Sequence, residues 1–163
     1  MRKKARRLAH AAIIAALYAV LTHMQNILVP NSASFAIQFR ISEALCVLAF
    51  FTPAAIYGLG VGCLVFNLTY AGALPLDFLV GSAASVSAAW AMWKLRNRPF
   101  LGLWMPALTN AILVGWELSV YIGGGFWMNA IYVAIGELIV MFTAGLAVYR
   151  ALSRGKLAAR LFK

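Results

Sequence analysis

Long apolar stretches separated by short basic clusters constrain the fold of this chain more than any other feature. The first stretch runs from about Leu8 to Leu28, directly after five Lys and Arg residues between positions 2 and 7. Further stretches cover residues 41–71, 76–93, 103–122 and 127–149. A helix of about 20 apolar residues is long enough to cross a bilayer. Since 64% of the residues are hydrophobic and the mean hydropathy is +0.86, the sequence predicts an all-α integral membrane protein.

The charge distribution agrees with this class. A net charge of +10 raises the alternative of nucleic-acid binding. However, the Lys and Arg residues lie in clusters between or beyond the apolar stretches, which is typical of the cytoplasmic flanks of membrane helices. The N-terminus also resembles a secretion signal, but its apolar run continues to about Pro30 without a small-residue cleavage pattern. We therefore interpret it as a retained first span.

The number of membrane crossings depends on how residues 41–71 are divided. A single crossing would leave the basic cluster at 94–98 outside, whereas a hairpin that turns near Pro53 to Gly58 places it inside, together with the basic C-terminal tail. The hairpin is therefore favoured, with two short or kinked helices. The sequence predicts one transmembrane domain over residues 1–163, with six membrane-spanning helices and both termini in the cytoplasm.

Small residues at helical spacing predict close contacts between helices. The first stretch carries two neighbouring rows of alanines: Ala11, Ala15 and Ala19, and Ala12 and Ala16. Such rows allow another helix to approach closely, either within the protein or in a partner subunit, and the spacing alone leaves both open. Gly58 and Gly62 form a GxxxG pair, for which helix packing is favoured over a dinucleotide-binding loop because no strand precedes it. Cys46 and Cys63 lack metal-ligand spacing, and we interpret them as small buried hydrophobic side chains with neither a disulfide nor a metal.

One short segment concentrates polar side chains in this apolar chain. Between positions 35 and 42, apolar residues at odd positions alternate with others at even positions, which is the pattern of an extended strand-like loop. A helix is then predicted to begin with Ser42 as its N-cap and Glu43 in its first turn, where a carboxylate suits the helix dipole. The loop thus brings Gln38, Arg40 and Glu43 to one end of a membrane helix. Alternatively, Arg40 and Glu43 form an ion pair that only fixes the loop.

The chain has four acidic residues: Glu43, Asp77, Glu117 and Glu137. In the six-span arrangement all four lie in the outer half of the membrane or near its middle. An ionisable group inside a bilayer is costly, so it must face the protein interior and find a partner there. The single Arg40 cannot satisfy four carboxylates, which predicts an outward-facing pocket for a hydrogen-bonding, cationic small molecule. For Asp77, a purely structural role at a helix start stays equally open.

Other residues complete the list of candidates. Asn67 and Asn129 are weaker candidates for the pocket lining. Trp116 lies beside Glu117 and is a candidate for stacking on a flat ligand, although anchoring at the membrane interface is the commoner role of such residues. His10 and His23 are not paired with acids or cysteines at ligand spacing, and no nucleophile, base or Walker A pattern stands out. We therefore expect neither an enzyme nor a bound cofactor.

Three segments resemble the QueT-type family of S-components, the substrate-binding subunits of energy-coupling factor (ECF) vitamin transporters. In chain order they are Ala36-Ile-Gln-Phe-Arg-Ile-Ser-Glu-Ala-Leu45, Thr52-Pro-Ala-Ala-Ile-Tyr-Gly-Leu-Gly60 and Gly72-Ala-Leu-Pro-Leu-Asp77. The resemblance extends from the first span to the fourth, whereas the sixth span is generic. It implies a six-helix subunit of a bacterial-type plasma membrane that captures a queuosine precursor, a 7-deazaguanine such as 7-aminomethyl-7-deazaguanine.

The resemblance also implies partners. Such a subunit works with a transmembrane coupling protein and two cytoplasmic ATPases, which hydrolyse the ATP. In that group an alanine-rich motif of the first helix meets the coupling protein, which favours the partner-interface interpretation for the five alanines named above. A guanine-like edge offers N–H donors to one carboxylate, and an aminomethyl cation suits a second. An S-component for another vitamin, a small membrane enzyme and a structural membrane subunit remain as alternatives.

Overall fold

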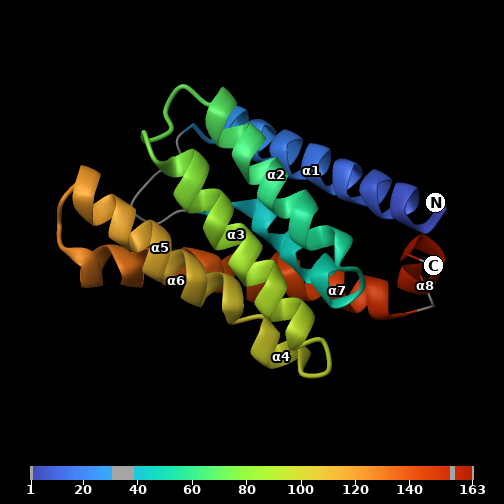
Figure 1. Ribbon diagram of the computed structural model, residues 1–163. Helices are drawn as coiled ribbons and strands as arrows, with labels where there is room; N and C mark the ends of the chain where they lie inside the picture. Colours follow the sequence, from blue (N-terminus) through green and yellow to red (C-terminus); the bar gives the residue numbers. More distant parts are fainter. Residues whose placement is uncertain (1, 31–38, 155–156, 163) are drawn as a thin grey trace.

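The computed structural model describes residues 2–30, 39–154 and 157–162, and within these residues it contains helices and no strand (Figure 1). The elements in chain order are α1 (Arg2–Leu28), η1 (Ile41–Phe50), α2 (Ala54–Thr69), α3 (Asp77–Lys94), α4 (Pro99–Gly102), α5 (Met105–Tyr121), α6 (Phe126–Val140), η2 (Met141–Gly145), α7 (Leu146–Ser153) and α8 (Leu157–Phe162). The prediction of an all-α fold is confirmed.

Three helical segments are long and apolar enough to cross a membrane: Lys3–Leu28, Pro99–Tyr121 and Phe126–Ser153. The last of these joins α6 and α7 through η2, a single turn of π-helix. Ile41–Phe50 and Ala54–Thr69 are apolar but shorter. The helix lengths are therefore consistent with a membrane protein.

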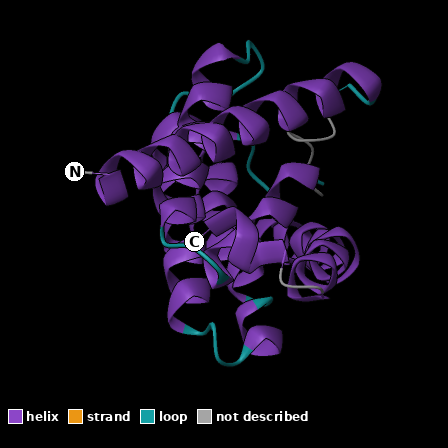
Figure 2. Cartoon of the chain, turned by 90° about the vertical axis from the view of Figure 1, so that its right-hand side faces the viewer, coloured by secondary structure: helices purple, strands orange, loops and turns teal. Residues whose placement is uncertain are grey.

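The helices form an arc around η1. Consecutive members of the series α1, α2, α3, α5 and α6 pack side by side, and η1 contacts α1, α2, α3, α6, η2 and α7. Eight of the ten η1 residues are buried, so this short helix lies at the centre of the molecule. Figure 2 shows the same all-helical arrangement from the side. Since η1 carries Ser42 and Glu43 of the polar segment singled out in the sequence, the fold surrounds these two residues with helices.

Residues 41–71 form the predicted hairpin. η1 runs antiparallel to α1, because Ser42 lies against Thr22 whereas Leu48 faces the same cavity as Ile13. α2 runs parallel to α1, because Gly58 lies against Ala11 and Gly62 against Ala15. The chain reverses at residues 51–53, slightly earlier than predicted, since α2 already begins at Ala54 and includes Gly58.

The start of η1 differs from the prediction. η1 is a 3₁₀-helix that begins at Ile41, after Arg40 in an extended conformation, and it has no side-chain cap of its own. Ser42 is therefore not the N-cap, although Glu43 does lie in the first turn. The cap comes from α1 instead: the Gln25 Oε1 atom accepts a hydrogen bond from the Ile41 amide at 2.7 Å, and the Gln25 amide donates to the Phe39 carbonyl. A capping group from another helix thus replaces the local one.

The GxxxG pair of α2 serves close helix packing, as predicted, and the structure identifies α1 as the partner helix. A Cβ atom at Gly58 would lie 2.7 Å from the Ala11 carbonyl oxygen, and one at Gly62 would lie 2.8 Å from that of Ala15. Only glycine allows the two backbones to approach so closely. The two alanine rows consequently differ: Ala15 and Ala19 are buried, whereas Ala12 and Ala16 are exposed.

The basic residues gather at one end of the molecule. The α3–α4 connection and the end of α7 meet there, since Phe50 packs on Tyr149 and also lies against Gly102. The start of α1 lies at the same end, because Lys4 and Arg7 line a pocket together with Pro53. Both termini lie at this end (Figure 1). Apart from Arg40, every Lys and Arg side chain that the structure describes belongs to these segments: Lys3, Lys4, Arg6, Arg7, Lys94, Arg96, Arg98, Arg150 and Arg154.

Candidate functional site

Arg40 and the four acidic residues form one buried group, which we call the charged cluster. Arg40 is 5% exposed, and Glu43, Asp77, Glu117 and Glu137 are 1%, 7%, 0% and 4% exposed. They come from the start of η1, the start of α3, the second half of α5 and the second half of α6. Arg40 interacts electrostatically with all four carboxyl groups. The structure thus brings together five residues that are spread over almost a hundred positions of the sequence.

Arg40 is the one basic residue of this cluster. Its guanidinium lies 3.9 Å from Cys63 Sγ, and its central carbon lies 5.8 Å from the centre of the Phe66 ring. Tyr18, Cys63, Asp77 and Glu43 are the groups that act electrostatically on the Arg40 guanidinium. Arg40 contributes a permanent positive charge to the protein interior.

Glu43 is held by donors of the protein. Its carboxylate accepts hydrogen bonds from the Tyr18 hydroxyl and, at 3.1 Å, from the Cys46 thiol. Tyr18 is fully buried on α1, and Cys46 is fully buried one turn further along η1. Glu43 is thus fixed between two helices before any ligand arrives.

Tyr18, Thr22 and Gln25 form a polar stripe on α1. None of the three is among the site residues predicted from the sequence. The Thr22 and Ser42 hydroxyls share a hydrogen bond of 2.7 Å, and Gln25 caps η1 as described above. The three positions follow the i, i+4, i+7 spacing of one helix face. That spacing was the available signal, because three polar residues on one face of an apolar span need polar partners.

Asp77 is also tied into the backbone. Its Oδ2 atom accepts a hydrogen bond of 2.6 Å from the Leu74 amide, and its own carbonyl accepts one of 2.7 Å from the Asn67 side chain. A Cβ atom at Gly81 would lie 2.8 Å from the Asn67 nitrogen and 3.8 Å from an Arg40 nitrogen, so Asn67 lies close to the charged cluster. Asp77 therefore fixes the start of α3 and faces the cluster as well.

Glu117 and Glu137 differ from Glu43. By hydrogen-bond geometry neither oxygen of the Glu117 carboxylate has a partner in the described part of the chain. The Asp77 carboxyl group nevertheless lies close enough to share a proton with it, and Arg40 also acts on it electrostatically. Glu137 accepts a hydrogen bond of 3.1 Å from Asn110, a buried residue that was not among the candidates, and its Oε2 atom has no partner there. These carboxyl groups retain acceptor capacity that the described protein atoms leave unused.

Two of the remaining candidates, Trp116 and Asn129, do not join the cluster. Trp116 lies on the outer surface of α5 and is 49% exposed. Asn129 is buried, but its side chain donates to the Gly123 carbonyl at 2.7 Å and thereby holds the α5–α6 turn. That turn has three consecutive glycines with φ of 80° to 87°, a conformation that other residues rarely adopt. Gln38 lies outside the residues that the structure describes.

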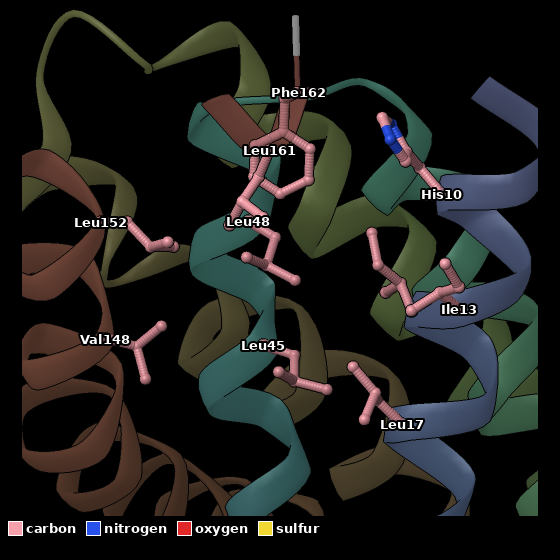
Figure 3. Close-up of a pocket in the computed structure, with 10 residues that line it drawn as sticks. His10, Ile13, Leu17, Leu45, Leu48, Val148, Leu152, Leu161 and Phe162 are labelled. Atoms are coloured by element: carbon pink, nitrogen blue, oxygen red, sulfur yellow. The ribbon is translucent and has the colours of Figure 1, made fainter. Parts of the chain in front are cut away.

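A separate cavity of about 440 Å³ lies between α1, η1, α7 and α8 (Figure 3). Its lining is apolar apart from His10, and consists of His10, Ile13, Ile14, Leu17, Leu45, Leu48, Val148, Leu152, Leu161 and Phe162. Such a lining has almost no polar group to orient a hydrogen-bonding ligand, so we do not assign the substrate site to it. Among the described residues, no group of three or more His, Cys, Asp or Glu side chains is arranged to hold a metal ion.

Comparison with known proteins gives one match. The family model described as "QueT transporter" matches residues 8–154 of the chain. No curated protein and no solved structure matches. The matched range contains all five residues of the charged cluster.

Proposed function

The chain belongs to the QueT transporter family, and from this premise we propose that it is the S-component of an ATP-driven ECF importer. Its substrate is a queuosine precursor, a 7-deazaguanine such as 7-aminomethyl-7-deazaguanine, taken up from outside. The observation that carries this proposal is the charged cluster: four buried carboxyl groups around one Arg, with both oxygens of Glu117 unused by the described protein atoms. A ligand with several N–H donors and a positive charge complements such a group.

The proposed membrane arrangement has six passes, made by α1, η1, α2, α3, α4 with α5, and α6 through α7. The chain would then be a multi-pass protein of a bacterial-type plasma membrane. The gathering of Lys and Arg side chains at one end supports a cytoplasmic location for that end and for both termini. The α2–α3 and α5–α6 turns would then face outward.

The proposed partners are a transmembrane coupling protein and two cytoplasmic ATPases. The sequence contains no Walker A pattern, so ATP hydrolysis is assigned to the partners. Of the five alanines on α1, Ala12 and Ala16 are exposed, whereas Ala15 and Ala19 are buried. We therefore assign the contact with the coupling protein to the exposed row.

Calorimetry on the detergent-purified protein tests the substrate. We expect tight binding of 7-aminomethyl-7-deazaguanine and much weaker binding of guanine and of thiamin. Preferential binding of thiamin would support an S-component for another vitamin. Binding of none of the three would overturn the deazapurine assignment, and turnover of any of them would indicate an enzyme.

A further inference from the structure

Hydrogen-bond donors are distributed unevenly over the charged cluster, and this distribution separates the roles of its acids. Resting on the proposed function, we infer that Glu117 and Asp77 bind the cationic group of the substrate, that Asn110 and Glu137 bind the edge of its ring system, and that Glu43 is a positioning residue without a ligand contact. Each pair of residues thereby contacts a different group of the ligand.

Within the charged cluster and at Asn67 beside it, the side-chain atoms without a hydrogen-bond partner are acceptors. In the described part of the chain they include Asn67 Oδ1, both oxygens of Glu117 and Glu137 Oε2. A buried acceptor without a hydrogen-bond partner destabilises the protein, and more so when it is charged. A ligand that removes this cost must donate hydrogen bonds at several points, which excludes anionic, acceptor-rich substrates.

The cation subsite is assigned to Glu117 because of its neighbour. Beside it lies a second carboxyl group, that of Asp77, and the nearby Arg40 is shared among four acids. Two adjacent buried carboxylates repel each other unless a positive charge or a proton compensates. A primary ammonium group is compact and has three donors, so it can satisfy both carboxylates at once.

The ring subsite is assigned to Asn110 and Glu137. This pair combines an amide, which both donates and accepts, with a carboxylate oxygen that has no partner among the described residues. A purine-like edge presents N–H donors next to a carbonyl acceptor, so a mixed pair suits it better than two carboxylates do. Glu43, in contrast, already accepts from Tyr18 and Cys46.

Two ligands that differ in one group test the assignment. The 7-aminomethyl form carries an ammonium group, whereas 7-cyano-7-deazaguanine has the same ring and no positive charge. The wild type should prefer the aminomethyl form. Glu117→Gln should weaken its binding about 10- to 100-fold, the range expected for one charge-assisted hydrogen bond, and change binding of the cyano form less than about threefold.

The other variants separate the remaining roles. Glu137→Gln should weaken the binding of both ligands. Glu43→Gln should weaken the binding of both by the same factor, so that the ratio of their dissociation constants stays unchanged. Ile112→Val, at an exposed position of α5, is the control variant and should bind both ligands with wild-type affinity. If Glu117→Gln does not yield folded protein, Asp77→Asn tests the same pair.

The outcomes distinguish the two levels of the proposal. A wild type that binds neither ligand overturns the proposed function and this assignment with it. A wild type that binds both ligands equally, or a Glu117→Gln variant that keeps the wild-type preference, overturns the assignment alone. A preference that disappears in Glu43→Gln and persists in Glu117→Gln would exchange the roles of the two residues and refute the inference.

Discussion

Glu43 and Glu117 show that one residue type takes opposite roles in the same cluster. Both are buried to 1% exposure or less, yet Glu43 accepts hydrogen bonds from two protein donors and Glu117 accepts none from the described residues. In the sequence, Glu43 follows a polar segment at a helix start and Glu117 lies inside an apolar stretch, but neither position reveals which acid has protein donors. The difference arises from α1, which supplies Tyr18 to one of them. The acids can therefore be identified from the sequence, but which of them has protein donors and which has none cannot.

At the residue scale we predict that Tyr18→Phe lowers stability. The substitution keeps the ring and removes the hydroxyl, so Glu43 loses one of its two donors in a fully buried position. We expect a loss of about 1–3 kcal/mol in the free energy of unfolding, measured by denaturation in detergent. Tyr57→Phe is the matched control, since Tyr57 is 71% exposed. Equal stability of the two variants would show that the Tyr18 hydroxyl contributes nothing.

At the scale of elements, the sequence predicted the hairpin from the distribution of basic residues, and it predicted close helix packing at the GxxxG pair without its partner helix. Gly58 and Gly62 lie at one-turn spacing, and such spacing is visible in any single sequence. The 3₁₀ form of η1, its start at Ile41 and its missing N-cap were not predictable in this way. They depend on Gln25, which lies 16 positions away on another helix. The start of η1 is therefore determined by a tertiary contact and not by a neighbouring residue in the sequence.

The α1–α2 contact gives a second prediction. Gly62→Ala should destabilise the protein by about 1–3 kcal/mol, because the added methyl group would meet the Ala15 carbonyl and the backbones would have to separate. Thermal unfolding in detergent measures the effect. Val61→Ala, at the exposed neighbouring position, should change stability much less. An unchanged unfolding temperature for Gly62→Ala would contradict the close packing.

The two alanine rows give a third prediction. Ala16→Leu, on the exposed row, should leave folding and ligand binding intact and abolish co-purification with the coupling protein and the ATPases. Ala15→Leu should instead disrupt the fold, because Ala15 is buried against Gly62. Normal assembly of the transporter with Ala16→Leu would exclude this row from the interface.

At the scale of the whole molecule, charge and position agree. The described Lys and Arg side chains lie at one end, with Arg40 as the exception, and the four acids lie buried among the helices. Sequence analysis could predict this segregation because the positive-inside rule acts on short loops, which are read directly from the chain. It could not predict that Trp116 lies on the outer surface while the adjacent Glu117 is buried, since that depends on how α5 is rotated against α3 and α6.

The six-pass arrangement is tested by labelling intact cells. Ala71→Cys lies in the exposed α2–α3 connection and should react with a membrane-impermeant maleimide from outside. Asn97→Cys lies in the exposed α3–α4 connection and should react only after the cells are permeabilised. The native Cys46 and Cys63 are fully buried and serve as the unlabelled background. The reverse labelling pattern would refute the orientation.

The polar stripe of α1 has a thermodynamic consequence. Tyr18, Thr22 and Gln25 join α1 to the start of η1, and the exposed Ala12 and Ala16 belong to the same helix of 27 residues. A partner that displaces α1 therefore strains the hydrogen bonds that hold Glu43, and it changes substrate affinity by some factor. By reciprocity, substrate binding must change the affinity for that partner by the same factor. Measuring substrate affinity with and without the partner, or partner affinity with and without the substrate, then gives the same coupling free energy.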